Sequence, residues 1–266
     1  MSTKPNQDQQ ATRRARRAAE RRAASPARGN GSSDAGRSPV LLITALVGGL
    51  AVVLLAALVL LQGSGPAKVD SAGLIAPPTS APTELADGRT LGKADAPVTL
   101  DVWSDFQCPA CGQYAEIVEP ALIHTYVTPG TLRIVHHDAA FQGAKSKAPF
   151  DESVEPAAGA RCAAEQGKYW PFHDWLFANQ SGENKGSFAD ARLRAIATNV
   201  GLDVVAWDAC RATGEQQTAV RSETYQGVAK GVNSTPTLFI NGEAIAGVRG
   251  ATELGQKIEA AAAAAK

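Results

Sequence analysis

Apolar and polar residues divide the 266-residue chain into four stretches. Residues 1–39 are polar and show no sustained apolar period, which predicts a disordered tail. Residues 40–61 carry no charge and are mostly apolar, and residues 62–90 are rich in Gly and Pro, which predicts a flexible tether. From 91 to 266 apolar positions recur with strand and helix periods, so the sequence predicts one folded domain there.

The folded domain opens with a pattern typical of a strand, a helix and a second strand. Residues 98–103 are β-branched and apolar, which predicts a strand. Residues 109–127 predict a helix, in which Pro109 is tolerated because the N–H that it lacks has no partner in a first turn. Residues 131–136 predict a second strand, so the three elements form a right-handed βαβ unit.

The chain changes character between about 155 and 230, where it is rich in Ala, has helical spacing and shows no strand pattern. The helices expected here cover 156–167, 170–178, 188–199 and 203–212, with Gly182 and Gly201 as breaks. Strands return at 237–240 and 244–245, on either side of an Asn-Gly pair that is typical of a two-residue hairpin turn. A helix over 251–264 completes an α/β fold: βαβ, a helical insertion, then ββα.

The stretch 40–61, VLLITALVGGLAVVLLAALVLL, is long enough to cross a membrane. Its 22 residues extend about 33 Å as a helix, against a hydrocarbon core of about 30 Å. A transmembrane signal-anchor is favoured over a cleaved signal peptide, whose apolar stretch is only about 7–15 residues, and over a buried core helix. Only Lys68 follows the span closely, whereas six arginines precede it: Arg13, Arg14, Arg16, Arg17, Arg21 and Arg22. This asymmetry predicts a single-pass protein of the cell membrane, with the tail in the cytoplasm and the domain outside.

Charge is distributed unevenly, although the formal net charge is zero. Residues 1–39 hold nine Lys and Arg against three Asp and Glu, whereas residues 90–266 hold fifteen against twenty. The folded part is therefore mildly acidic, which argues against a nucleic-acid partner. Beside a membrane span, we interpret the arginine run as an orientation signal that also contacts anionic lipid.

All four cysteines lie in the part of the chain that is expected outside the cytoplasm, where disulfides form. Cys108 and Cys111 have the spacing of a redox-active dithiol or of half a zinc site. In a first helical turn their Cα atoms would be about 5–6 Å apart, within disulfide range. The helix start favours the thiolate of Cys108, which makes Cys108 the attacking sulfur and Cys111 the resolving one. An inert disulfide is the alternative, and no second Cys-x-x-Cys supports a metal site.

Cys162 and Cys210 lie at opposite ends of the helical stretch. Neither stands at a short loop or a helix start that would activate a thiol, so a structural disulfide is favoured over a second redox pair or two free cysteines. Closing this loop would stabilise the fold by about 4 kcal/mol in the chain-entropy model.

Three separated motifs occur in order: APVTL with SDFQCPAC at 96–111, EQGKYW with HD and LF at 165–177, and GVNSTPTLFING at 231–242. Together they resemble the DsbA-like branch of the thioredoxin superfamily, over roughly residues 90–262. The resemblance implies a thioredoxin fold with a helical insertion and an enzyme, a thiol:disulfide oxidoreductase that needs no organic cofactor or metal.

The resemblance also assigns positions around the dithiol. It implies a cis peptide bond before Pro236, which would face the dithiol while the backbone of Thr235 meets an extended substrate; spacing alone leaves cis and trans open. Pro109 and Ala110 complete this wall, and Phe106 is expected either in the core or at the border of a substrate groove.

Two departures from the family pattern concern proton transfer. Ala110 stands where some relatives carry a His that stabilises the thiolate, so Cys108 depends more on the helix start. Val102 stands where relatives often have a buried acid, and Asp101 beside it would point to the other face of the strand. Asp101 as a proton relay is therefore a weak hypothesis, and His136, His137 and His173 are interpreted as packing or surface residues.

The function implied is donation of the Cys108–Cys111 disulfide to reduced exported proteins. Reoxidation would come from a membrane partner of the DsbB or vitamin K epoxide reductase type. Two alternatives stay open: a reductase or isomerase on the same fold, and a non-catalytic substrate-binding module with a structural Cys108–Cys111 disulfide.

Overall fold

A computed structural model describes residues 73–143, 150–245 and 250–265. The tail and the membrane span that the sequence predicts lie outside these residues. Among the helices that are described, none is both long and apolar enough to cross a membrane.

A six-stranded sheet forms the centre of the domain, in the order β1-β2-β4-β3-β5-β6. Its strands are β1 (Ala86–Asp87), β2 (Thr90–Leu91), β3 (Val98–Ser104), β4 (Leu132–Asp138), β5 (Thr237–Ile240) and β6 (Glu243–Ile245). β3 and β4 pair in parallel, and the other neighbours are antiparallel. The parallel strands β3 and β4 are connected by the helix that begins at Pro109, so the predicted βαβ unit is confirmed.

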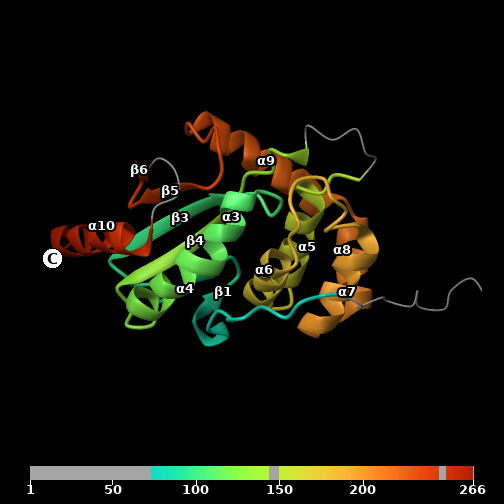
Figure 1. The fold of residues 1–266 in the computed structure, drawn as a ribbon, viewed down its shortest axis with the longest axis horizontal. Helices are drawn as coiled ribbons and strands as arrows, with labels where there is room; N and C mark the ends of the chain where they lie inside the picture. Colours follow the sequence, from blue (N-terminus) through green and yellow to red (C-terminus); the bar gives the residue numbers. More distant parts are fainter. Residues whose placement is uncertain (1–72, 144–149, 246–249, 266) are drawn as a thin grey trace, which may run out of the picture. The chain divides into compact units, whose positions relative to one another are not determined.

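The helix between β3 and β4 alternates between α-helical and π-helical turns. Its segments are α3 (Pro109–Gln113), η2 (Tyr114–Val118), α4 (Glu119–Leu122) and η3 (Ile123–Val127). Pro120 has no N–H and would clash with the preceding turn of an α-helix. The wider π turn avoids this problem, because the N–H of Glu119 reaches the carbonyl of Tyr114 five residues back. Figure 1 shows this helix in front of the sheet.

The helical insertion consists of five helices, followed at the C-terminal end of the domain by a sixth. They are α5 (Val154–Ala164), α6 (Tyr169–Ala178), α7 (Asp190–Val200), α8 (Val204–Ala212), α9 (Glu215–Ala229) and α10 (Ala251–Ala264). The sequence analysis missed α9, because only Val220 and Gly227 are buried in its 15 residues and no apolar stripe marks it. Gly227 lies flat against Trp103, where a Cβ atom would come within 2.6 Å of the ring.

Order begins earlier than the sequence suggests, since part of the predicted tether is folded. Residues 86–91 form the β1–β2 hairpin, which extends the sheet beside β4. The N–H of Ile75 donates to Asn179 Oδ1 at 2.8 Å, and that of Ala81 donates to Asp174 Oδ2 at 2.9 Å. These bonds to α6 and the residue after it satisfy backbone groups that a flexible tether would leave to water.

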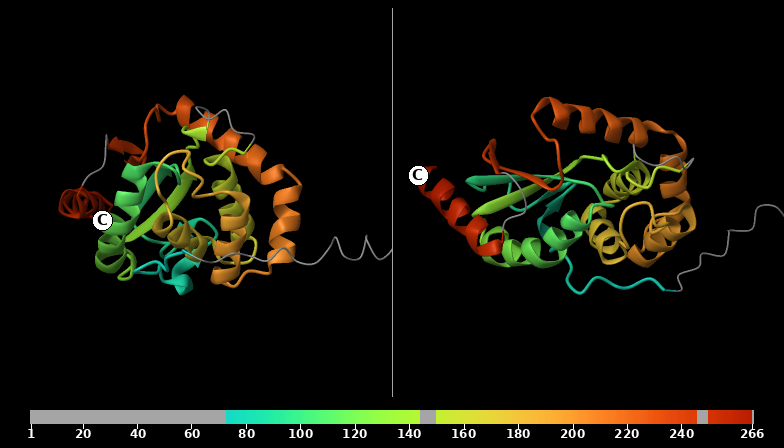
Figure 2. Two further views of the ribbon diagram at one scale, coloured as in Figure 1. Left: turned by 45° about the vertical axis from the view of Figure 1, so that its right-hand side comes forward. Right: turned by 45° about the horizontal axis from the view of Figure 1, so that its top comes forward.

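The core lies between the sheet and the helices that cover it. Leu100, Val102 and Ile134 point from β3 and β4 towards one face and are at most 1% exposed. Leu122 from α4 and Ile258 from α10 are also fully buried there. Figure 2 (right) shows α3–α4 on one side of the sheet and α9 on the other. The start of α3 therefore lies at the end of β3, beside the helical insertion.

Candidate active site: the Cys108–Cys111 dithiol

The two cysteines occupy the turn that connects β3 to α3. Cys108 is the N-cap residue of α3, and Pro109 begins the helix. The N–H of Cys108 donates to the carbonyl of Asp105 at 2.9 Å, and that of Gly112 donates to the carbonyl of Cys108 at 3.1 Å. Both thiols are free; Cys108 is 6% exposed, and Cys111 is completely buried. The sulfur of Cys108 thus lies at the outer end of the pair.

The site stabilises a negative charge on one sulfur and a proton on the other. The thiol of Cys111 donates to Cys108, and this bond, with contributions from Thr235 and the N–H groups of Ala110 and Cys111, outweighs burial and lowers the pKa of Cys108 to about 5. Burial raises the pKa of Cys111 well above its usual value, and the charge on Cys108 raises it further. At neutral pH the reduced pair therefore holds a Cys108 thiolate and a Cys111 thiol.

Thr235 and Pro236 face Cys108 across the site, although they lie far away along the chain. The Thr235–Pro236 peptide bond is cis. In its thiol form, Cys108 donates to the carbonyl oxygen of Thr235 at 3.3 Å. Pro236 is buried and Thr235 is half-buried, so backbone groups before the proline lie next to the sulfur.

A buried carboxylate supports the loop that leads into the dithiol. Asp105 Oδ1 accepts from the N–H of Gln107 at 2.9 Å. Its Oδ2 accepts from the N–H of Gln142 and from the hydroxyl of Ser153, each at 2.9 Å. Burial raises the pKa of Asp105 to about 6, against these three hydrogen bonds. The sequence analysis quoted Asp105 only as part of a motif, and Ser153 could not be connected to it without the fold.

Phe106 lies inside the domain and not at the border of a surface groove. It is 1% exposed, and its ring stacks on His136 with a centroid distance of 5.4 Å. The rings of His173 and Phe106 pack edge to face, with a centroid distance of 5.8 Å. Both histidines are buried, His136 with its Nδ1 at 2.7 Å from the hydroxyl of Tyr169. The side chain of Phe106 therefore anchors the active-site loop in an aromatic cluster and is not available to a substrate.

Asp101 lies on the other side of the sheet from the buried Val102. Its Oδ1 is 2.8 Å from His137 Nε2, and the other nitrogen of that ring is 2.9 Å from Glu223 Oε1. His137 also stacks on Trp103. Val102 is 1% exposed and occupies the position at which relatives of the DsbA-like branch often have a buried acid. The structure thus gives Asp101 a partner in β4 and offers no contact between Asp101 and either thiol among the described residues.

Glu119 is a buried acid that the sequence analysis did not single out. It is 2% exposed, its Oε1 is 3.9 Å from His173 Nε2, and its Oε2 has no hydrogen-bond partner among the described residues. Burial raises the pKa of Glu119 to about 7; His173 opposes this shift and Asp174 adds to it. The hydroxyl of Tyr114, three residues after Cys111, is also buried and unpartnered within the described part of the chain.

We expect Glu119→Gln to flatten the dependence of stability on pH. A carboxyl whose pKa is raised by folding stabilises the domain at low pH, and this stability is lost as the pH rises from about 4.5 to about 7. Between pH 5 and pH 8 the free energy of unfolding of the variant should therefore fall by about 2 kcal/mol less than that of the wild type. Urea unfolding at both pH values measures this, with the exposed Glu116→Gln as control. Equal slopes for Glu119→Gln and wild type would contradict the buried ionisation.

Cys162 and Cys210 form a disulfide that connects α5 to α8, with a Cα–Cα distance of 5.9 Å. Cys162 is buried within the insertion, whereas Cys210 is partly exposed. This disulfide leaves Cys108 and Cys111 as the free thiols of the chain, whose four cysteines are all described.

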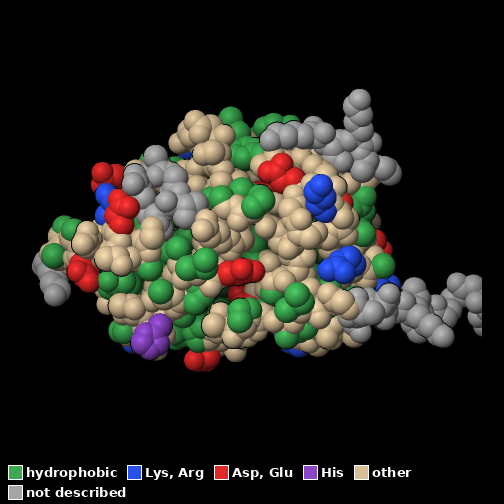
Figure 3. Space-filling model, in the orientation of Figure 1, with side chains coloured by type: hydrophobic (Ala, Val, Ile, Leu, Met, Phe, Trp, Pro, Cys, Tyr) green, Lys and Arg blue, Asp and Glu red, His purple; other side chains and the backbone are tan. Residues whose placement is uncertain are grey.

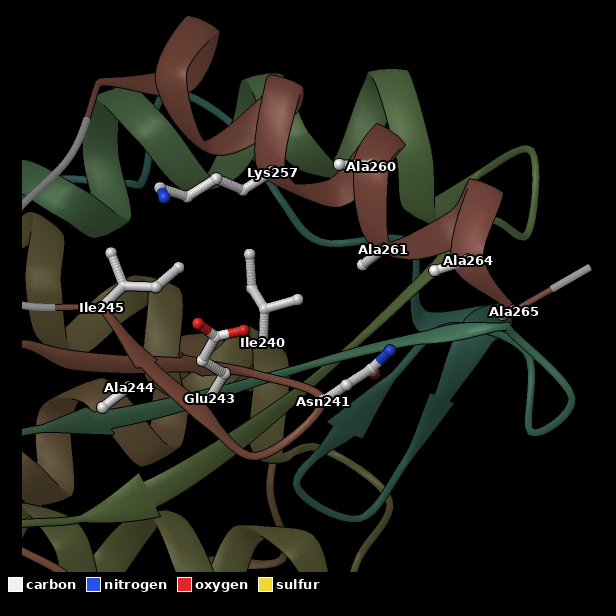
Figure 4. A pocket seen from close by; sticks show the side chains of 10 residues that line it. All are labelled: Ile240, Asn241, Glu243, Ala244, Ile245, Lys257, Ala260, Ala261, Ala264 and Ala265. Carbon is white, nitrogen blue, oxygen red and sulfur yellow. The ribbon is translucent and has the colours of Figure 1, made fainter.

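A groove elsewhere on the domain does not include either thiol, and its lining offers no nucleophile comparable to the dithiol. It has a volume of about 630 Å³, between the β5–β6 hairpin and the Ala-rich second half of α10. Figure 4 shows Glu243 and Lys257 there among alanines and isoleucines. Within the described residues no group of three His, Cys, Asp or Glu side chains is placed to hold a metal ion. Chemistry therefore points to the dithiol as the candidate active site.

Comparisons with known proteins agree with this assignment. The family model described as Thioredoxin matches residues 84–260. A probable disulfide bond formation protein D of Bacillus anthracis is 26% identical over 157 residues, which cover 58% of this chain and 70% of that protein. The Na(+)/H(+) antiporter NhaA 3 of Salinispora tropica is 30% identical over 151 residues, which are 57% of this chain but only 21% of the antiporter. The chain thus spans about a fifth of the length of that relative.

Solved structures show the same fold. BdbD from Bacillus subtilis, in its oxidised form, superposes with a TM-score of 0.56 at 20% identity, over 69% of this chain and 96% of BdbD. Reduced DsbA from Mycobacterium tuberculosis superposes with a TM-score of 0.53 at 22% identity, over 68% of this chain and all of that one. These likenesses confirm the predicted thioredoxin fold with a DsbA-like helical insertion. Since the family model covers more than half of the chain, this protein belongs to the thioredoxin family.

Proposed function

We propose that this protein is a membrane-anchored, extracytoplasmic thiol:disulfide oxidoreductase that donates its Cys108–Cys111 disulfide to exported proteins. The division of charge and proton between the two sulfurs carries the proposal. Cys108 has the lowered pKa and lies beside Thr235, whereas Cys111 is buried and keeps its proton. Such an asymmetric pair suits an ordered exchange in which one sulfur meets the substrate and the other resolves it.

The exchange has two steps, which transfer two electrons from the substrate to the enzyme. A substrate thiolate attacks Cys108 Sγ, the Cys108–Cys111 bond breaks, and Cys111 leaves as a thiolate that takes up a proton. A second substrate thiolate then attacks the substrate sulfur of the mixed disulfide and releases Cys108 as a thiolate. The substrate gains a disulfide, and the enzyme is left in the dithiol form of the structure.

The stability of the reduced form supports donation as the direction of transfer. A thiolate stabilised by hydrogen bonds lowers the free energy of the dithiol, which makes the corresponding disulfide a stronger oxidant. The bonds that lower the pKa of Cys108 therefore favour disulfide donation over reduction. The reductase or isomerase remains the alternative that the reduction potential distinguishes.

Two observations support a location outside the cytoplasm. The uncharged stretch 40–61 with arginines before it is typical of a signal-anchor with its N-terminus inside. The Cys162–Cys210 disulfide suits an oxidising compartment, since cytosolic proteins rarely keep structural disulfides. The reduced enzyme would then need a disulfide-bearing membrane partner of the DsbB or vitamin K epoxide reductase type. The exchange itself uses only sulfur chemistry and requires no organic cofactor.

We expect the Cys108 thiolate to appear at acidic pH. As the pH rises, the ultraviolet thiolate absorbance of the reduced protein should increase with a midpoint near pH 5, because hydrogen bonds at the helix start stabilise the anion. The step should disappear in Cys108→Ser. In Cys111→Ala the midpoint should move upward, because the variant loses the Cys111 thiol donor, which contributes most to the lowered pKa of Cys108. A midpoint near the ordinary thiol value, about 8.5, would remove the main support for the proposal.

A further inference from the structure

A groove of about 540 Å³ lies directly beside the dithiol, a volume sufficient for a few side chains. We call it the helix-start groove. Its apolar lining consists of Pro109, Ala110, Ile117 and Phe177. The first two of these follow Cys108 directly in the chain, so the groove begins one residue after the cysteine that we propose to react.

The groove is held in a fixed position relative to Cys108. Gln180, just after α6, donates from its Nε2 to the carbonyl oxygen of Cys108 at 3.0 Å. Gly112 makes this approach possible, because a Cβ atom there would lie 2.9 Å from Gln180 Oε1. One wall thus comes from α3 and η2, and the other comes from the end of α6.

Part of the apolar lining is open to solvent. Ile117 is 64% exposed, and Pro109 is also exposed. A single exposed isoleucine is ordinary, but here it stands in a groove with three further apolar residues next to a reactive sulfur. Exposure at this position suits a surface that a substrate segment covers while its cysteine is joined to Cys108.

The groove has an uncompensated negative charge. Glu116 lines it and is exposed, and within the described part of the chain it has neither a hydrogen bond nor an ion pair. A smaller hollow next to it shares Glu116 and Phe177. Asp174 also lines that hollow, but its Oδ1 is 3.0 Å from His173 Nδ1, so Glu116 alone carries the uncompensated charge. No Lys or Arg is found among the described residues that line either hollow. In Figure 3 the prominent blue side chains of this face lie over the helical insertion, away from α3.

From these features we infer that the helix-start groove binds the substrate segment next to the reacting cysteine and prefers segments with a basic side chain beside an apolar one. The apolar side chain would cover Ile117 and Phe177, and the basic one would pair with Glu116. From Cys108 to Glu116 the helix advances about 12 Å, which an extended segment spans in about three to four residues. The basic residue therefore stands about three to four positions from the cysteine. This inference rests on the proposed function.

Peptides that differ in one charge test the preference. The probes are peptides with one cysteine and, three to four residues away on each side in turn, either Lys or Glu with a Leu next to it. The measured quantity is the rate constant with which the peptide thiol attacks the Cys108–Cys111 disulfide of the oxidised full-length chain in detergent. For each enzyme variant this rate constant is divided by the one measured with dithiothreitol. We expect the better of the two Lys peptides to react about two- to fivefold faster than its Glu counterpart, in keeping with an exposed ion pair.

Charge variants of the enzyme localise the effect. Glu116→Lys should reverse the preference, whereas Glu243→Lys, the same charge change on β6, should keep it. Ile117→Ser should slow both peptides several-fold relative to dithiothreitol. High salt should reduce the preference, because exposed charges are screened.

Two results overturn the inference and leave the proposed function intact: equal rates for both peptides, or an equal loss of preference in Glu116→Lys and Glu243→Lys. A chain whose Cys108–Cys111 disulfide resists dithiothreitol and peptides alike would instead overturn the proposed function, and this inference with it.

Discussion

Replacing Cys108 with Ser should abolish disulfide transfer, with a loss on the order of a thousandfold or more in the oxidation of a reduced protein. A hydroxyl cannot form the disulfide that the substrate attacks, and the remaining thiol of Cys111 is fully buried with a raised pKa. Refolding of reduced ribonuclease, followed by the return of its activity, measures the effect.

Cys111→Ser is the matched variant, because it removes the resolving sulfur and keeps the attacking one. It should lose turnover as well. When it is mixed with a substrate protein that already carries a disulfide, the Cys108 thiolate should attack that bond, release one substrate sulfur as a thiolate and remain as a mixed disulfide, visible on non-reducing gels. Full refolding activity in Cys108→Ser would refute catalysis by this pair and favour a substrate-binding module.

The reduction potential of the wild-type pair then decides the direction of transfer. A value well above the roughly −270 mV of thioredoxin, from equilibration with glutathione, is the expected result for a disulfide donor. A value near that of thioredoxin would assign the site to reduction or isomerisation. Either outcome leaves the fold and the positions of Cys108 and Cys111 unchanged.

Among the variants proposed for this protein, the one that lacks the Cys162–Cys210 disulfide should lose the most stability. The bond closes a loop with a sequence separation of 48, and its absence from Cys162→Ala/Cys210→Ala should lower the free energy of unfolding by about 4 kcal/mol. The mechanism is mainly the greater freedom of the unfolded chain, and the cavity left beside the buried Cys162 adds to it. For a domain of this size the melting temperature should fall by about 8–16 °C.

Chemical denaturation under non-reducing conditions measures this loss. Cys108→Ala/Cys111→Ala is the control, since it removes two thiols that are only three positions apart and should change stability far less. A loss below about 1 kcal/mol in the insertion variant would contradict the chain-entropy argument. If mass spectrometry of the unreduced wild-type protein found no crosslink between residues 162 and 210, the disulfide itself would be contradicted.

Local periodicity was sufficient for much of the fold. The helix over 109–127, the two central strands and the Asn-Gly hairpin all follow from patterns that repeat within a few residues. The arrangement of Cys108 before Cys111 is local as well, because a strand end, a Pro and a helix start lie within a few residues of each other. The segment α9 shows the limit of such patterns: it is polar on most positions, and Glu223 on it is held by Arg89 and Arg161 from elsewhere in the chain.

Only the tertiary structure decided the environment of the dithiol. Desolvation depends on what packs around a side chain, so no pattern near Glu119 shows that it is buried beside His173. Hydrogen-bond partners depend on the fold in the same way. Asp105 accepts a hydrogen bond from Ser153, and Cys108 donates one to Thr235, which is 127 positions away in the chain. The sequence by itself determined which two sulfurs form the pair and where the helix begins. The helix start also indicated that Cys108 is the sulfur that carries the charge. Folding added the contact with Thr235 and the burial of Cys111, because these depend on segments that lie far away in the chain.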